Sequence, residues 1–139
     1  MELNFRITNM QPSLLLVEDE FGSGGWLGRF LRHAGYRCYE ADNGAAGLSL
    51  LEKEKIQIVI SDIALPDMDF TDFVKTVKSR KPYVEVIFLA AHGSIYDAVQ
   101  AIKSGAFNYL IKGRANDTLL PLLAEANEIV ADHEQSYQA

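Results

Sequence analysis

The sequence contains very little cysteine and no long hydrophobic run. Cys38 is the only cysteine in 139 residues, which excludes an intrachain disulfide and a cysteine cluster for zinc, and suits a reducing cytoplasm. No apolar run approaches the roughly 18 residues of a membrane span, and the first dozen residues lack the basic-then-apolar order of a signal peptide. We therefore expect a cytoplasmic protein with no membrane association.

Positive charge is also scarce. The formal net charge is -6, which disfavours nonspecific binding to nucleic acid or to anionic lipid. Hydrophobic residues make up 48% and charged residues 23%, as is ordinary for a soluble globular protein. The length fits one domain with a single sizeable core. We expect no direct nucleic acid binding by this domain.

Short apolar runs alternate with longer amphipathic stretches five times along the chain. The periodicity predicts strands at 14–17, 36–40, 56–61, 84–89 and 108–111. The first, third and fourth runs are nearly unbroken Leu, Ile, Val and Phe, as expected for parallel strands covered on both faces, whereas the second is more polar and reads as an edge. The alternation predicts an α/β fold in three layers, with helices on both faces of a doubly wound parallel sheet.

The helices carry recognisable start and stop signals. Ser94 and Asp97 match a capping box, and Gly105 supplies a left-handed stop, so a helix is predicted at 95–104. Other helices should start at Asn43, Asp69 and Asn116, with 132–139 fraying into a polar tail and the last helix burying Leu119, Leu123, Ala126 and Val130. Before the second strand, glycines should delay the helix until near Gly24. Neither GxxxxGK[ST] nor GxGxxG occurs there, which argues against a phosphate-cradling loop.

Charged residues stand where the predicted strands end. The first strand runs into Glu18 and Asp19, the third into Asp62, and the fifth into Lys112, whereas the fourth ends in alanines. Ligands of open parallel sheets bind beyond the carboxyl ends of the strands. Converging acids require a cation, and oxygen ligands suit Mg2+, while a lysine attracts an anionic group such as phosphate.

This constellation indicates a Mg2+-assisted phosphoryl site in which Asp62 is either a metal ligand or a nucleophile. Each part also has an ordinary interpretation: a solvated acidic loop, a surface lysine, and an aspartate that caps a turn. Their coincidence at the tips of three strands favours the site.

The stretches LLLVEDE, VISDIALPDMD, AAHGS and AIKSGAFNYLIK occur in this order on the predicted elements. Together they resemble the receiver domain of two-component response regulators, a CheY-like domain. The resemblance implies a five-stranded flavodoxin-like sheet of order 2-1-3-4-5. It covers 13–133, with 1–12 as an N-terminal extension and 134–139 as a polar tail.

The resemblance also implies roles for single residues. Asp62 would be the phosphoacceptor, taking a phosphoryl group from a sensor histidine kinase or phosphotransfer protein to regulate a downstream output. The implied Mg2+ ligands are Asp19, Asp62, the Ala64 carbonyl and, through water, Glu18. Lys112 and the Ala91 backbone would contact the phosphoryl group, and Tyr109 would be the aromatic switch. The domain would signal and would not be an enzyme, and a homodimer is compatible with it.

Three positions depart from the family pattern. Ala90 stands where Thr or Ser is usual, so phosphorylation should remain possible while the switch responds weakly. Gly113 replaces the usual Pro after the lysine, so we expect a trans bond at Lys112-Gly113 and a looser, displaced loop, because a cis bond before a non-proline residue costs about 2.5 to 4 kcal/mol. Phe70 replaces a common Gly, which predicts plain packing if the ring is buried and a partner surface if it is exposed.

Two other functions compete with the signalling receiver. A degenerate receiver would act as a phosphorylation-independent interaction module, and the three departures favour that alternative. A phosphatase of the haloacid dehalogenase type also uses an Asp nucleophile, Mg2+ and Lys on a parallel sheet. That family needs an acid two residues after the nucleophile, where this chain has Ala64, so we regard it as the weakest alternative.

Overall fold

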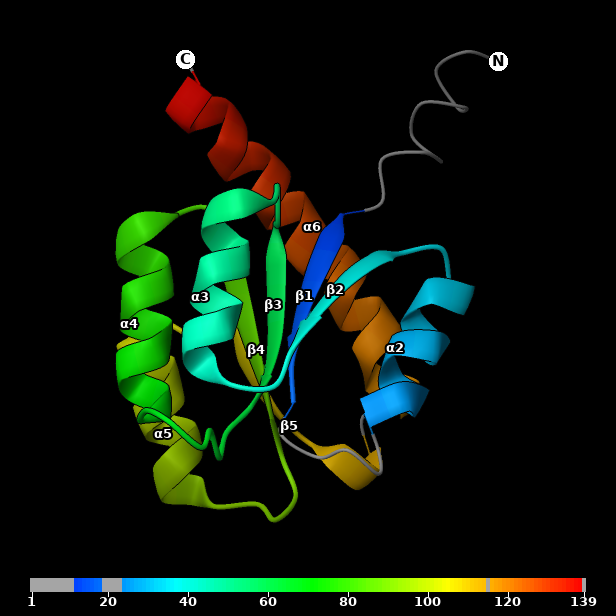
Figure 1. Cartoon of the computed structure of the whole chain (residues 1–139), viewed down its shortest axis with the longest axis vertical. Helices are drawn as coiled ribbons and strands as arrows, with labels where there is room; N and C mark the ends of the chain where they lie inside the picture. Colours follow the sequence, from blue (N-terminus) through cyan, green and yellow to red (C-terminus); the bar gives the residue numbers. More distant parts are fainter. Residues whose placement is uncertain (1–11, 19–23, 115, 139) are drawn as a thin grey trace.

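The computed structural model describes residues 12–18, 24–114 and 116–138 (Figure 1). Its strands are β1 (Ser13–Val17), β2 (Arg37–Ala41), β3 (Ile58–Asp62), β4 (Glu85–Ala90) and β5 (Asn108–Ile111). Its helices are α2 (Gly24–His33), α3 (Gly44–Lys53), α4 (Phe70–Arg80), α5 (Ile95–Ser104), the 3-10 turn η1 (Lys112–Arg114) and α6 (Asn116–Gln138). Strand and helix alternate as the periodicity predicts.

The five strands form one parallel sheet in the order β2-β1-β3-β4-β5. The predicted fold class and the predicted strand order are therefore confirmed. Val17 lies opposite Ser61 and Asp62 lies opposite Leu89, so the ends of the three central strands are level with one another. This register brings the residues that follow each strand to one edge of the sheet.

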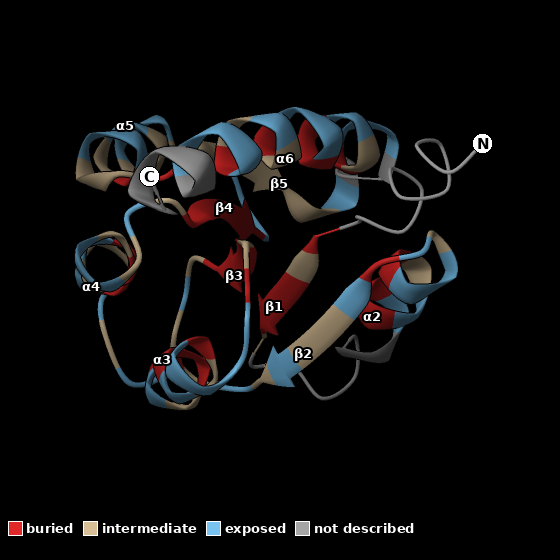
Figure 2. Ribbon diagram, turned by 90° about the horizontal axis from the view of Figure 1, so that it is seen from above, coloured by how far each residue is buried: buried red, intermediate tan, exposed pale blue. Residues whose placement is uncertain are grey.

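Two apolar cores cover the two faces of the sheet, because successive side chains of a strand point to opposite faces. Leu14, Ile58 and Ile87 belong to the core shared with α2 and α6. Their neighbours along the strands belong to the core shared with α3, α4 and α5. Figure 2 shows the buried residues on the strands and on the inward sides of the helices. The molecule thus has the three layers expected.

The predicted start and stop signals are found at the helix ends. Ser94 caps α5 by accepting a hydrogen bond from the Asp97 amide, and Gly105 adopts a left-handed φ of 119° directly after it. Asn43 and Asp69 cap α3 and α4 in the same way. These local side-chain bonds satisfy amide groups that a helix leaves unpaired at its start.

The end of the chain differs from the prediction. The expected residues of α6 are buried, but the helix continues through Pro121 and runs to Gln138 instead of fraying from Asp132. The segment 132–138 contains Glu134, Gln135 and Gln138, which have good helix propensity, and neither Gly nor Pro, so it can prolong a helix that is already nucleated. α2 is described from Gly24 onward, and the residues before it, on which the expected delay depends, lie outside the described part of the chain.

Candidate functional site

Asp62 is the last residue of β3 and lies almost entirely inside the protein. The five residues of β3 are all buried, and Asp62 is 5% exposed. Lys112 begins η1 directly after β5, two strands away, and its side chain reaches back across the end of β4. Its Nζ lies 2.8 Å from Asp62 Oδ1. A buried carboxylate and its ammonium partner thus meet at the carboxyl edge of the sheet, as predicted.

Glu18 follows β1 at the same edge. Because Val17 pairs with Ser61, Glu18 and Asp62 come next on neighbouring strands, about 5 Å apart along the hydrogen-bonding direction. The Glu18 amide donates to the Ala41 carbonyl at 3.0 Å, and its carboxylate oxygen Oε2 is buried. The site therefore contains a second carboxylate, supplied by a different strand.

The predicted metal site is described only in part. Asp19 lies outside the described residues, and Ala64 is exposed in the loop after β3. Within the described ranges no group of three or more His, Cys, Asp or Glu side chains is close enough to hold a metal. The oxygens of Glu18 and Asp62, with the Ala64 carbonyl beyond them, are nonetheless of the type that Mg2+ prefers.

The end of β4 carries no hydroxyl. Ala90 is 1% exposed and lies opposite Ile111, directly before Lys112, while Ala91 is exposed. No cis peptide bond occurs in the described parts of the chain, which include Lys112 and Gly113, so the expected trans bond is confirmed. Both residues of this bond belong to the 3-10 turn η1.

Tyr109 lies on β5 opposite Phe88 and packs against the core shared with α3, α4 and α5. Its hydroxyl is buried and has no hydrogen-bond partner among the described residues. Since Phe88 and Ala90 point to the same face of β4, the Tyr109 ring lies on the face to which the methyl group of Ala90 points. The expected switch residue is thus present beside the position that lacks a hydroxyl.

Phe70 is half-buried at the start of α4. Its ring packs edge-on against Phe88, with 5.6 Å between the ring centroids. The substitution for the usual Gly is therefore explained by packing, and the ring does not form an exposed surface at the site.

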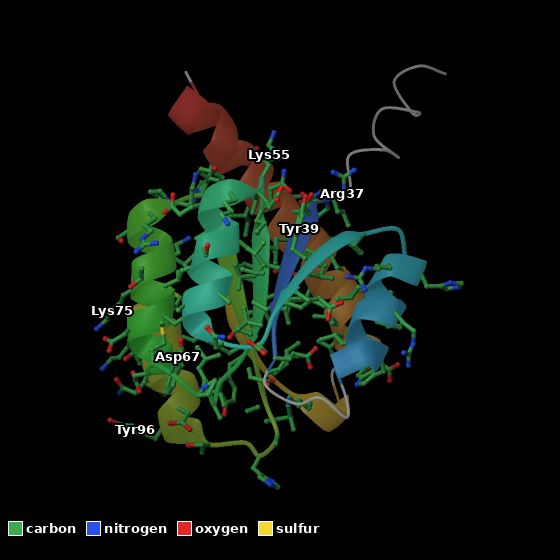
Figure 3. All side chains as sticks on the ribbon, viewed as in Figure 1. Arg37, Tyr39, Lys55, Asp67, Lys75 and Tyr96 are labelled. Atoms are coloured by element: carbon green, nitrogen blue, oxygen red, sulfur yellow. The ribbon has the colours of Figure 1, made fainter. Side chains whose placement is uncertain are left out.

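Asp67 was missed by sequence reasoning. It lies in the loop 63–69 between β3 and α4, and its two carboxylate oxygens accept hydrogen bonds from the Gly44 amide at 2.8 Å and the Ala45 amide at 2.9 Å. These bonds, that to Ala45 first, lower the pKa of the Asp67 carboxyl. Figure 3 shows Asp67 close to the first turn of α3. The only signal in the sequence is the pair Pro66-Asp67, which is typical of a turn and does not identify a distant partner.

An apolar stripe is exposed on α5. Its members are Ile95, Tyr96, Val99 and Ile102, with exposed fractions of 87%, 71%, 45% and 50%. They recur at helical spacing, and Tyr96 extends from the helix away from the sheet (Figure 3). Patches of this kind on a soluble protein often contact another protein.

The doubly wound sheet, with an acid and a lysine paired at its carboxyl edge, defines the class of CheY-like α/β domains. Residues 14–124 match the family model described as the response regulator receiver domain. The chain therefore belongs to the family of response regulator receiver domains. None of its described helices is both long enough and apolar enough to span a membrane.

Individual proteins agree with the family. The chain is 40% identical over 115 residues to the transcriptional regulatory protein GlrR of Escherichia coli strain K12, covering 83% of this chain and 26% of GlrR. The beryllofluoride-activated NtrC4 receiver domain dimer superposes with a TM-score of 0.79 at 28% identity, covering 85% of this chain and 98% of that one.

A response regulator from Burkholderia pseudomallei with a phosphorylated aspartic acid, calcium ion and citrate gives a TM-score of 0.75 at 28% identity, covering 90% of this chain and 74% of that one. The chain spans about a quarter of the length of curated relatives such as GlrR.

Proposed function

We propose that this receiver domain, spanning 13–133, accepts a phosphoryl group on Asp62 from a sensor histidine kinase or phosphotransfer protein and thereby regulates a downstream output. The observation that carries the proposal is the Asp62 carboxylate, 5% exposed and 2.8 Å from the Lys112 ammonium at the carboxyl edge of the sheet. The phosphorylated aspartate and calcium ion of the Burkholderia pseudomallei regulator support it by analogy.

The transfer moves the phosphoryl group from a histidine nitrogen to a carboxylate oxygen. A bond forms between an Asp62 oxygen and phosphorus, the bond from phosphorus to the imidazole nitrogen breaks, and the donor histidine leaves with the electron pair. Lys112 lies where it can hold an oxygen of the incoming group, because its ammonium already faces the acceptor carboxylate. The Ala91 backbone at the end of β4 is the second phosphoryl contact in this proposal.

Glu18, Asp19, Asp62 and the Ala64 carbonyl are the residues that would hold Mg2+. When bound, Mg2+ neutralises negative charge on the acids and on the phosphoryl oxygens. Burial of the acceptor serves the same reaction, since it keeps water from the carboxylate before transfer and from the acyl phosphate afterwards.

The test is phosphorylation by acetyl phosphate with Mg2+, measured as a gain of one phosphoryl mass that disappears in hydroxylamine. We expect the wild type and Asp72→Ala, which removes an exposed acid of α4, to gain this mass, and Asp62→Ala to gain none. Labelling of Asp62→Ala to the wild-type level would overturn the assignment. An unlabelled but folded wild type would favour the phosphorylation-independent interaction module, for which the missing hydroxyl at Ala90 is the specific evidence.

A second copy of this chain is the partner that we propose for the apolar stripe of α5. Four large apolar side chains on one helix are solvent-exposed, and the similar NtrC4 receiver is described as a dimer in its beryllofluoride-activated form. We expect Val99→Glu to reduce self-association in beryllofluoride, measured by sedimentation velocity, and Glu125→Lys on α6 to leave it unchanged. Equal self-association of wild type and Val99→Glu would contradict this choice of surface.

A further inference from the structure

The loop after the phosphoacceptor is tied to a helix that lies far from it in the chain. Both carboxylate oxygens of Asp67 accept hydrogen bonds from the first two amides of α3, those of Gly44 and Ala45, at 2.8 and 2.9 Å. The next residue, Met68, packs on the same place: a Cβ added to Gly44 would come within 2.7 Å of Met68 Sδ. Loop and helix start are thus fitted closely to each other.

α3 does not need Asp67 for its own capping. Asn43 already caps the helix, because its side-chain oxygen accepts a hydrogen bond from the Ala46 amide at 2.8 Å. A local cap of this kind is what most helices have. Asp67 lies more than twenty residues further along the chain. Because α3 already has its own cap, the main effect of the Asp67 hydrogen bonds is to hold the loop 63–69 in place.

The tie limits the freedom of the segment that carries Ala64. At its start, the Ile63 amide donates to the Leu89 carbonyl at 2.9 Å, which fixes the chain to β4. At its end, Asp67 fixes it to α3. Only 64–66 lies between these anchors, and Pro66 further restricts its backbone. A short segment held at both ends keeps its carbonyl groups in a defined place.

We propose that Asp67 is a positioning residue for the phosphorylation site: by bridging the loop 63–69 to the start of α3, it holds the Ala64 carbonyl in place for the cation beside Asp62. The inference rests on the proposed function, since it concerns the cation of that reaction. Asp67 does not itself contact the phosphoryl group. It acts through the loop, and misplacement by even 1 Å can slow a reaction severely.

Asp69 supplies a matched control in the same loop. Like Asp67 it is an exposed aspartate that caps a helix, and its pKa is lowered, chiefly by the hydrogen bond from the Thr71 hydroxyl. Its backbone bond is local, from the Thr71 amide two residues ahead at 3.0 Å. Asp67→Ala and Asp69→Ala should lower Tm by similar amounts, but only Asp67→Ala releases the loop from α3.

The experiment compares wild type, Asp67→Ala, Asp67→Asn and Asp69→Ala. Mg2+ affinity is measured by NMR titration of backbone amides, and hydrogen exchange is followed at Gly44, Ala45 and Ile63. We expect Asp67→Ala to weaken Mg2+ binding by roughly tenfold and to speed exchange at Gly44 and Ala45. Asp67→Asn, which keeps one acceptor oxygen, should have an intermediate effect, and Asp69→Ala should remain within about twofold of wild type.

Two outcomes would overturn the inference. Equal weakening of Mg2+ binding by Asp67→Ala and Asp69→Ala would indicate a general loss of stability, and unchanged exchange at Gly44 and Ala45 in Asp67→Ala would contradict the bridge. If the wild type binds Mg2+ but takes up no phosphoryl group, the proposed function is wrong. The effect of Asp67 on Mg2+ binding can still be measured in that case. If the wild type binds no Mg2+, Asp67 is not a positioning residue for the cation.

Discussion

Two lysine-carboxylate pairs lie at opposite ends of the sheet, and they differ in how firmly each is held. Lys78 of α4 lies 3.5 Å from Glu85 at the start of β4, and Lys112 lies 2.8 Å from Asp62 at the end of β3. The side chains are similarly exposed, 24% and 9% in the first pair and 27% and 7% in the second. Burial and pairing alone therefore do not distinguish them.

The contacts around each lysine distinguish the two pairs. In addition to its ion pair with Glu85, the Lys78 ammonium donates hydrogen bonds to the carbonyls of Pro82 at 2.8 Å and Val84 at 2.7 Å. A Cβ added to the neighbouring Gly105 would come within 3.2 Å of the Lys78 stem. The residue after Lys112 is Gly113, where an added Cβ would meet nothing within 4 Å. The Lys78 ammonium is thus fixed by backbone carbonyls in a closely packed part of the fold, whereas the residue that follows Lys112 is surrounded by open space.

Lys78→Met should give the largest loss of stability. It leaves the Glu85 carboxylate and two backbone carbonyls without their donor, and we expect the free energy of unfolding to fall by about 2–3 kcal/mol, less than for a wholly buried pair because Lys78 is a quarter exposed. Urea denaturation measures the loss. Lys75→Met, at an exposed position of the same helix, should stay within about 0.5 kcal/mol of wild type. A similar result for both variants would remove the distinction between the two ends of the sheet.

Lys112→Met should have the opposite profile. We expect a smaller change in the free energy of unfolding, about 1 kcal/mol, because the loss of Lys78 also leaves the Pro82 and Val84 carbonyls without their donor. Binding of beryllofluoride with Mg2+ should weaken by roughly tenfold or more, since a charge-assisted contact is worth about 1.5 to 3 kcal/mol. Fluorine NMR measures that binding. If Lys112→Met costs as much stability as Lys78→Met and leaves beryllofluoride binding intact, the two lysine-carboxylate pairs do not differ in role.

Ala90→Thr sharpens the comparison by adding the hydroxyl that the end of β4 lacks. The extra atoms at a position that is 1% exposed should cost about 1 kcal/mol of stability. In return, the hydroxyl can donate to the phosphoryl group and couple Asp62 to Tyr109. We expect the phosphorylation-induced NMR shifts at Tyr109 to grow. Shifts equal to those of wild type would show that Ala90 does not weaken the switch.

Tyr109→Phe should have the smallest effect, and a stabilising one. The Tyr109 hydroxyl is buried without a hydrogen-bond partner among the described residues, and an unmet polar group of this kind costs about 1–3 kcal/mol. Removing the oxygen should raise the free energy of unfolding by up to about 1 kcal/mol in urea denaturation. A clear loss of stability would mean that the hydroxyl has a partner in solution.

The sequence predicted those features that depend on local chemistry. The limits of α5 follow from Ser94 and Gly105, and the sheet order follows from three strongly apolar strands together with the family motifs. Asp62 and Lys112 could be brought together because carboxyl ends of parallel strands share one edge. Features that depend on a few neighbouring residues, or on the general geometry of a parallel sheet, can be predicted from a single sequence.

The sequence did not predict which distant groups the charged residues contact. Lys78 fits the basic end that a helix dipole favours, yet its ammonium serves Glu85 and two carbonyls beside it. An acid within the apolar run 84–89 was a signal that a buried partner was required. For Asp67 no periodicity could identify the amides of α3 as its donors, because that contact depends on how the loop folds back.

The ion pair between Asp62 and Lys112 also bears on the order of events when the chain folds. Its partners are far apart in sequence, and β4 lies between their strands, so it can form only after both intervening crossovers have docked. A nascent chain that still lacks its fifth strand has the Asp62 carboxylate without the Lys112 ammonium beside it. The site that we propose for phosphorylation is therefore among the last parts of the newly synthesised protein to be completed.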